Sequence, residues 1–189
     1  DEAENIYSML FRDEILVGLL QKDKNHPSFY VRSWVGGDKD GHPGVDQKAM
    51  LESLNLSRAK LIILVKQELK AIRKTLDIFP SKSLHKDIFK IETSLRRLTK
   101  ISSGDAKLVQ NFRVTIHNLK KSYENEIGAV HPHLNNLLLI MHTFPGLVVP
   151  LELRESSDVL MSEQVGHRQK LAIFRMLQTL EKISRTGDP

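Results

Sequence analysis

Apolar residues recur at helical spacing along most of the chain, and this pattern predicts a mainly helical protein. The longest such stretch, 46–142, opens on Asp46, a residue type that favours a helix N-cap. Pro80 and the pair Ser103-Gly104 divide this stretch, so we expect several helices rather than one. One stripe advances by alternating steps of four and three residues along a single helix face: Leu84, Ile88, Ile91, Leu95 and Leu98.

Helices are also predicted on either side of the central stretch. Residues 5–20 carry an apolar pattern typical of a helix, and residues 165–184 predict a last helix. Within the central stretch, Asp105 is expected to cap the helix that follows Gly104, and 133–142 is expected to be a short helix. The inward face of the last helix is predicted to consist of Leu171, Phe174, Leu177 and Leu180.

Two short segments predict β-strands instead. Bulky β-formers alternate in 29–35, and 147–153 is a second candidate, although Pro150 cannot donate a hydrogen bond to a ladder. Residues 36–44 hold four glycines and a proline, so we expect a shaped loop there. Strands this far apart form a sheet only with each other or with strands outside the chain. The expected fold is therefore mainly α with two short strands, a slice of a larger α/β enzyme.

Composition narrows the class of protein. The chain has no cysteine, which excludes disulfides and cysteine chemistry, and its formal net charge is +5. Its apolar runs are too short to span a bilayer and its acidic start is unlike a signal peptide, so we expect a cytoplasmic protein without a membrane partner. Basic residues are spread along the chain, with one Trp and three Tyr to stack on bases, which argues against nucleic acid as a partner. The missing initiator Met and the tail after residue 184 lead us to expect a piece of a longer chain.

The first candidate site lies in Ser33-Trp34-Val35-Gly36-Gly37-Asp38-Lys39-Asp40-Gly41-His42-Pro43. A strand here delivers Trp34 into a glycine-rich turn, where the backbone can approach a ligand or a neighbouring strand closely. A tight strand-to-helix connection held by aspartate hydrogen bonds would show the same pattern. The residues alone leave both interpretations open.

The second candidate is Arg154, which follows the predicted strand 147–153. A guanidinium at a strand end is a natural partner for a phosphate or a carboxylate, because its fork donates two parallel hydrogen bonds. The competing interpretation is a salt bridge with Glu152, Glu155 or Asp158.

Both segments resemble the signature segments of phosphoenolpyruvate carboxylases. The first is similar to Ser-Trp-Met-Gly-Gly-Asp-Arg-Asp-Gly-Asn-Pro and departs from it at Val35, Lys39 and His42. The second is similar to Phe-Gly-Leu followed by Leu-Asp-(Ile/Leu)-Arg-Gln-(Asp/Glu)-Ser, with Glu152 and Glu155 in place of Asp and Gln.

The resemblance implies a helix-rich (β/α)8 barrel, in which active-site residues follow the strands. It places Trp34 on an apolar wall beside the three-carbon part of the substrate, and it points Arg154 at phosphoenolpyruvate. The loop residues that would support this site are Gly36, Gly37, Asp38, Lys39, Asp40 and Gly41. The sequence Leu56-Ser57-Arg58 also looks like the family's next helix. The resemblance further implies that residues 1–189 are a single fragment of the barrel domain.

The family forms oxaloacetate from phosphoenolpyruvate and bicarbonate without biotin. Bicarbonate attacks the phosphate, and the carbon dioxide released from carboxyphosphate is captured by the enolate of pyruvate. The resemblance also implies Mg²⁺ or Mn²⁺ held by carboxylates, allosteric regulation and a homotetramer for the parent enzyme. Neither the family's Thr-Ala-His-Pro-Thr motif nor a Gly-Arg-Gly-Gly loop occurs in this chain. We therefore expect the metal ligands and catalytic groups in the remainder of the same polypeptide, and an inactive isolated chain.

Two other classes of protein remain open. A non-catalytic helical interaction module derived from the same family is compatible with the departures from the family pattern. A basic helical nucleic-acid binder is the third hypothesis. His131 and His133 flank a proline without an acidic or histidine partner at helical spacing, so they do not predict a metal site.

Overall fold

The computed structural model describes residues 32–39, 42, 44–157 and 167–184. This part of the chain is mainly helical, as the apolar periodicity predicts. Its helices are α3 (Gln47–Ile78), α4 (Lys82–Arg97), α5 (Asp105–Ile127), α6 (Pro132–Thr143) and α8 (His167–Ser184). The predicted helix 5–20 lies outside the described residues, as do positions 165–166 of the last one.

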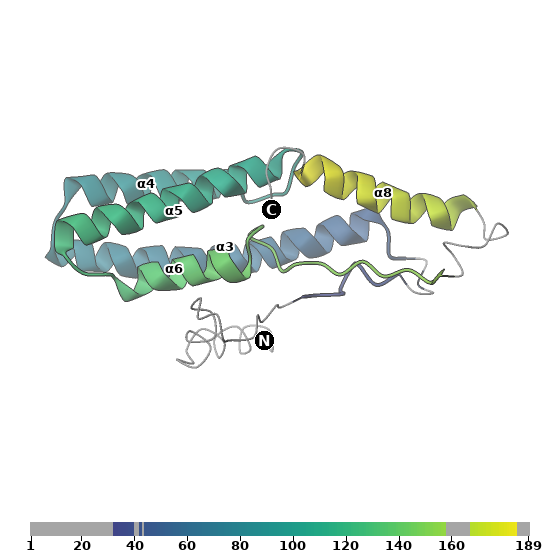
Figure 1. Ribbon diagram of the computed structural model, residues 1–189, viewed down its shortest axis with the longest axis horizontal. Helices are drawn as coiled ribbons and strands as arrows, with labels where there is room; N and C mark the ends of the chain where they lie inside the picture. Colours follow the sequence, from purple (N-terminus) through teal and green to yellow (C-terminus); the bar gives the residue numbers. More distant parts are fainter. Residues whose placement is uncertain (1–31, 40–41, 43, 158–166, 185–189) are drawn as a thin grey trace, which may run out of the picture.

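Helices α3 to α6 form a four-helix bundle with short connections (Figure 1). Each helix packs on its successor, and α6 closes the ring on α3. The predicted stripe of α4 is confirmed, because Leu84, Ile88, Ile91, Leu95 and Leu98 are all buried in the bundle core. Burying an aliphatic side chain of this size contributes roughly 1.5–3 kcal/mol. The bundle is therefore held mainly by these apolar stripes.

The helix ends follow the predicted breaks, with one correction. The N-cap at Asp46 is confirmed: its Oδ1 accepts hydrogen bonds from the backbone N–H groups of Lys48 and Ala49, each at 2.9 Å. The predicted cap at Asp105 is wrong. Gly104, at φ 73°, occupies the N-cap position, and Asp105 is the first residue of α5. Its carboxylate forms a buried ion pair with Arg58, so it does not cap the helix.

The N-terminal half of α3 extends beyond the short helix α6. A helix of 32 residues spans about 48 Å, whereas α6 has 12 residues. Helix α8 and the extended segments 32–39 and 145–157 lie along this half (Figure 1). A second, smaller core forms here from Met50, Leu54, Ile101, Ile173 and Met176. This half of α3 is the platform on which the candidate site is built.

The predicted inward face of α8 is wrong at Phe174 and Leu177 and right at Leu180, while the side chain of Leu171 lies outside the described part of the chain. Phe174 and Leu177 are 57% and 48% exposed, while Ile173 and Met176 are buried. The buried set continues through Leu180 and Ile183, which pack against the second core. Steps of three, four and three residues stay on one helix face, whereas the predicted steps of three drift around the helix.

The described residues contain no sheet, so the two predicted strands are not found there; positions 29–31 of the first strand lie outside the described residues. Segments 32–39 and 147–157 touch instead through two isolated parallel bridges, Ser33 to Leu151 and Asp38 to Arg154. A turn separates the bridges, because the backbone N–H groups of Gly37 and Asp38 both donate to the carbonyl of Trp34, at 2.9 and 2.8 Å. A slice of a barrel is accordingly not confirmed. None of the described helices has the length and apolarity needed to cross a membrane.

Candidate functional site

The first bridge joins Ser33 to the segment that leads to Arg154. The Ser33 N–H donates to the Pro150 carbonyl at 2.9 Å, and the Ser33 carbonyl accepts from the Glu152 N–H at 2.8 Å. Pro150 thus contributes only its carbonyl, so its missing N–H leaves no gap in the pairing. Just before it, the Val149 N–H donates to the Ser57 hydroxyl of α3 at 2.6 Å. The pair of segments is therefore fastened to the platform helix.

The second bridge fixes Arg154 itself. Its N–H donates to the Gly37 carbonyl, and its carbonyl accepts from the Lys39 N–H, both at 2.9 Å. The turn that opens at Trp34 lies between the two bridges, so the indole is presented beside the residue that the second bridge holds. Backbone pairing alone therefore brings the two predicted site residues together.

The two glycines of the turn are required by close approach. Gly36 has φ +81°, and a Cβ there would lie 2.8 Å from the Ser53 Cβ of α3. A Cβ on Gly37 would lie 2.3 Å from the Glu152 carbonyl oxygen of the facing segment. Real Cβ contacts are not this short, so a side chain at either position would push the turn off its support. Of the other predicted loop residues, Asp40 and Gly41 lie outside the described residues.

Trp34 and Arg154 form a cation–π contact at the surface. The guanidinium carbon of Arg154 lies 5.5 Å from the centroid of the Trp34 ring. The two side chains are 59% and 49% exposed, so a molecule from solvent can reach both. A contact of this kind contributes about 0.5–1 kcal/mol at an exposed site. The arrangement offers an apolar plate with a hydrogen-bonding cation against it.

Arg154 is already engaged in the ion pair that the competing interpretation predicts. Its Nε and Nη2 lie 3.3 and 3.2 Å from the same carboxylate oxygen of Glu152. Glu152 is itself about as exposed as Arg154, and ion pairs of this type contribute only about 0–1 kcal/mol. The fork can therefore exchange this carboxylate for a stronger anion at little cost.

A second ion pair, Lys39 with Glu155, is buried. The Lys39 Nζ lies 3.4 Å from the Glu155 Oε2, and both side chains are 4% exposed. These are two of the positions at which the chain departs from the resembled pattern, and the departures lie in contact with each other. Breaking a buried pair leaves a charge without compensation, so this contact has a structural role that the exposed pair lacks.

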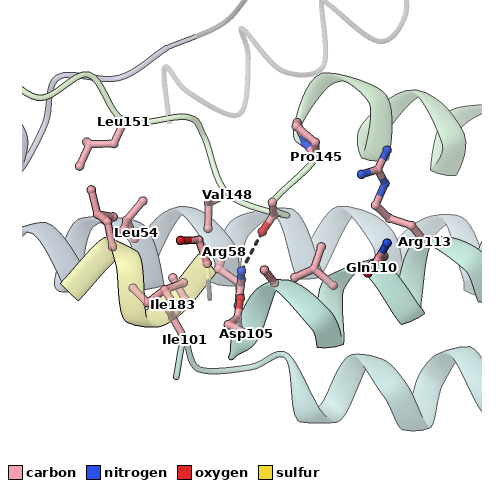
Figure 2. Close-up of a pocket in the computed structure, with 15 residues that line it drawn as sticks. Leu54, Arg58, Ile101, Asp105, Gln110, Arg113, Pro145, Val148, Leu151 and Ile183 are labelled. Carbon is pink, nitrogen blue, oxygen red and sulfur yellow. Dashed lines mark hydrogen bonds and ion pairs between the residues drawn. The ribbon is translucent and has the colours of Figure 1, made fainter. Parts of the chain in front are cut away.

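The sequence interpretation gave no role to Arg58, which is 2% exposed. Its Nη1 donates to the Asp105 carboxylate and its Nη2 to the Gly146 carbonyl, both at 2.7 Å, while Nε reaches the Leu147 carbonyl at 3.4 Å (Figure 2). Arg58 thereby holds the turn that starts the Arg154 segment against α3 and α5. The sequence contains an indication of this burial, because Arg58 occupies the position between Leu54 and Leu61 on the apolar face of α3.

His131 lies at a helix end. His131 is the N-cap of α6: its Nδ1 accepts from the His133 N–H at 3.2 Å, and its Nε2 lies 2.9 Å from the Thr75 hydroxyl. Burial lowers the pKa of His131 below its usual value; the charge of His133 lowers it further, and Glu68 opposes them. Among the described residues, no group of three or more His, Cys, Asp or Glu side chains is placed to hold a metal ion.

Comparison with known proteins gives one match. The family model for phosphoenolpyruvate carboxylase matches residues 13–181, which is most of the chain and includes both candidate segments. No curated protein and no solved structure matches significantly.

Proposed function

The chain belongs to the phosphoenolpyruvate carboxylase family, and from this premise we propose that it supplies part of the phosphoenolpyruvate pocket of a larger carboxylase. The supporting observation is the contact between Trp34 and Arg154, which two backbone bridges impose on segments far apart in sequence. In this proposal residues 1–189 are one fragment of the barrel domain. The parent enzyme is a cytoplasmic, allosterically regulated homotetramer that forms oxaloacetate from phosphoenolpyruvate and bicarbonate.

Arg154 binds the anionic end of the substrate in this proposal. Phosphoenolpyruvate carries a phosphate and a carboxylate, and both match the two-pronged guanidinium. Because the pair with Glu152 is half-exposed, a phosphate displaces it readily. Trp34 covers the three-carbon part, where a flat apolar face excludes water from the reacting atoms.

The loop residues position these two groups. Gly36 and Gly37 let the turn lie against α3 and the facing segment, and Lys39 fastens it to Glu155. Asp38, which is partly buried and bridged to Arg154, belongs to the same support, and we assign Asp40 and Gly41 to it as well. None of these residues is proposed to take part in proton or group transfer.

The divalent cation of the family supplies charge neutralisation at the enolate and phosphoryl oxygens when it is bound. The described residues do not fit such an ion, since no cluster of ligands is present among them. We therefore place Mg²⁺ or Mn²⁺, with the catalytic groups, in the remainder of the polypeptide, and no biotin is needed.

Trp34 is the only tryptophan of the chain, so its fluorescence reports on this site directly. We expect phosphoenolpyruvate to change the emission saturably. Arg154→Met should weaken the apparent affinity by about tenfold or more, the value of one charge-assisted hydrogen bond. Arg96→Met, which removes an exposed arginine at the end of α4, is the matched control and should leave the titration unchanged. No response of Trp34 to phosphoenolpyruvate would refute the site.

The fragment part of the proposal has a separate test. The isolated chain, given phosphoenolpyruvate, bicarbonate and Mg²⁺, should form no oxaloacetate in an assay coupled to malate dehydrogenase. Turnover would show that the chain is complete, while the fluorescence titration would still decide the role of Arg154.

A second candidate is a non-catalytic interaction module that retains the family scaffold. The observation that favours it is that the Arg154 fork already binds Glu152. On this alternative, Trp34 emission is insensitive to phosphoenolpyruvate, and a longer polypeptide carrying Arg154→Met keeps its full function.

A further inference from the structure

A cavity of about 380 Å³ lies away from the Trp34 site, between α3, α5, α8 and the segment 145–151 (Figure 2). Its volume falls within the range of pockets that bind small molecules, about 300–1,000 Å³. Neither Trp34 nor Arg154 lines it. The cavity therefore offers a binding site separate from the proposed substrate pocket.

Most of its wall is aliphatic. Helix α3 contributes Leu54, α5 contributes Val109, the extended segment contributes Val148 and Leu151, and α8 contributes Ile183. Such a wall favours an apolar group. A small, highly charged molecule would lose its hydration there and gain no polar partners on the aliphatic side chains. Phosphoenolpyruvate is for this reason a poor occupant.

The charged side chains that line the cavity differ in whether they are free to bind a ligand. Arg58 and Asp105 neutralise each other, and Nε and Nη2 of Arg58 donate to the backbone carbonyls of Leu147 and Gly146. Arg113, on α5, is partly buried and has no hydrogen-bonding or ion-pair partner in the described part of the chain. One uncompensated cation thus remains beside an apolar cavity, which favours an anion there.

The apolar and the cationic residues of the lining lie at different ends of the cavity. In Figure 2, Arg113 and Gln110 lie toward the end near Pro145, whereas Leu151 and Ile183 lie toward the other end. The Gln110 amide is an additional donor within the same lining. A molecule with an anionic head and an apolar body would match both ends at once.

We propose that this cavity binds a small amphipathic monocarboxylate. The carboxylate is bound by the Arg113 guanidinium with the Gln110 amide, and the apolar body lies between Val148 and Ile183. A second negative charge would lie against aliphatic side chains, so a monoanion is preferred to a dianion. This site is independent of the proposed carboxylase function and stands or fails without it.

The test compares two probes with the same apolar body, phenylbutyrate and the corresponding alcohol, phenylbutanol. Their binding is followed by NMR of the isoleucine methyl groups of the whole chain. Ile101 and Ile183 line the cavity and should shift on titration. Ile88 and Ile116 lie in the bundle core and should not. The acid should bind about tenfold more tightly than the alcohol, because only the acid engages a cation.

Variants locate the charge. Arg113→Met keeps the aliphatic stem and should weaken phenylbutyrate by about tenfold while leaving phenylbutanol within about twofold. Lys121→Met, an exposed lysine on the same helix, is the control and should change neither affinity. Ala106→Phe fills the cavity and should abolish binding of both probes.

Several results would overturn the proposal. If the acid and the alcohol bind equally well, Arg113 does not bind the carboxylate. The same conclusion follows if the Arg113→Met variant binds phenylbutyrate as the unmodified chain does. Shifts confined to Ile88 and Ile116 would place the probe elsewhere. A dimer in sedimentation that Ala106→Phe dissociates, with no phenylbutyrate binding, would show that a second copy occupies the groove. Because Arg113 is only partly buried, its variant decides the question even if Ala106→Phe fails to fold.

Discussion

Replacing Arg58 with methionine should be among the most destabilising single changes in this chain. The change leaves the Asp105 carboxylate, 2% exposed, without its cation, and it removes the donors from two carbonyls of the 146–147 turn. Breaking a buried pair from one side costs about 3–5 kcal/mol. A protein of this size has roughly 5–15 kcal/mol of stability, so we expect a loss of about 4 kcal/mol that leaves a folded but marginal protein.

The partner variant should cost less. Asp105→Asn removes the negative charge but keeps a carbonyl oxygen for Arg58, whose other donors still reach Gly146 and Leu147. We expect a loss of about 2 kcal/mol. In the double variant Arg58→Met, Asp105→Asn no charge is buried, so its loss should be smaller than the sum of the single losses by about 1–3 kcal/mol.

The assay is urea unfolding followed by helical circular dichroism, with stability extrapolated to water. Arg73→Met is the matched control: this arginine is exposed and its Nη1 lies 3.3 Å from the Glu92 carboxylate, so its loss should stay below about 1 kcal/mol. A loss of stability below about 1 kcal/mol for Arg58→Met would refute the proposed role of the buried pair between Arg58 and Asp105. So would a double variant no more stable than additivity predicts.

Three further predictions address the site and the helix ends. Gly37→Ala should shift Trp34 emission, because its Cβ would lie 2.3 Å from a carbonyl oxygen of the facing segment. Lys39→Met should cost about 3 kcal/mol in urea unfolding, because it buries the Glu155 carboxylate without its cation; adding Glu155→Gln should recover part of the loss. The folded-state pKa of His131 lies below its unfolded value, so the unfolded chain binds protons first and stability falls as pH drops below about 6.5. His131→Asn, which can still cap α6, should lose less melting temperature than the unmodified chain between about pH 7 and about pH 5.5.

Each of these predictions has a control in the chain. Gly128→Ala also changes a glycine with positive φ, but in open space, so it should cost about 1 kcal/mol and leave Trp34 emission unaltered. Lys48→Met breaks an exposed pair and should be nearly neutral. His117→Asn, on the exposed face of α5, should keep the pH dependence of the unmodified chain. If His131→Asn loses as much on acidification as the unmodified chain, the titrating group lies elsewhere.

The sequence predicts the helices of the bundle well because their apolar stripes are local and continuous, although it does not predict the bundle itself. Leu84 to Leu98 follow one face without a break, and every member of that stripe is buried. The last helix is harder because it carries two apolar stripes. Only its neighbours α3 and α5 decide that Ile173 and Met176, rather than Phe174 and Leu177, face inward.

The contact between Trp34 and Arg154 agrees with the family resemblance, which places both residues at one substrate pocket. The sequence did not predict how the backbone makes this contact. We expected regular strands to bring the two residues together, but a turn at Trp34 interrupts the pairing. The sequence also could not predict the ion pairs, because spacing does not show whether Asp105 caps a helix or binds Arg58 from another element.

The pairing of Ser33 with Leu151 has a kinetic consequence. Most contacts in the bundle join helices that follow one another and so close small loops, whereas this pairing joins opposite ends of the whole intervening helical chain. Closing a large loop is entropically slow, and weakly buried regions open before the core does. We therefore expect the helices to assemble first and to bring the two segments within reach, so that among the described residues the surface around Trp34 forms last and opens first.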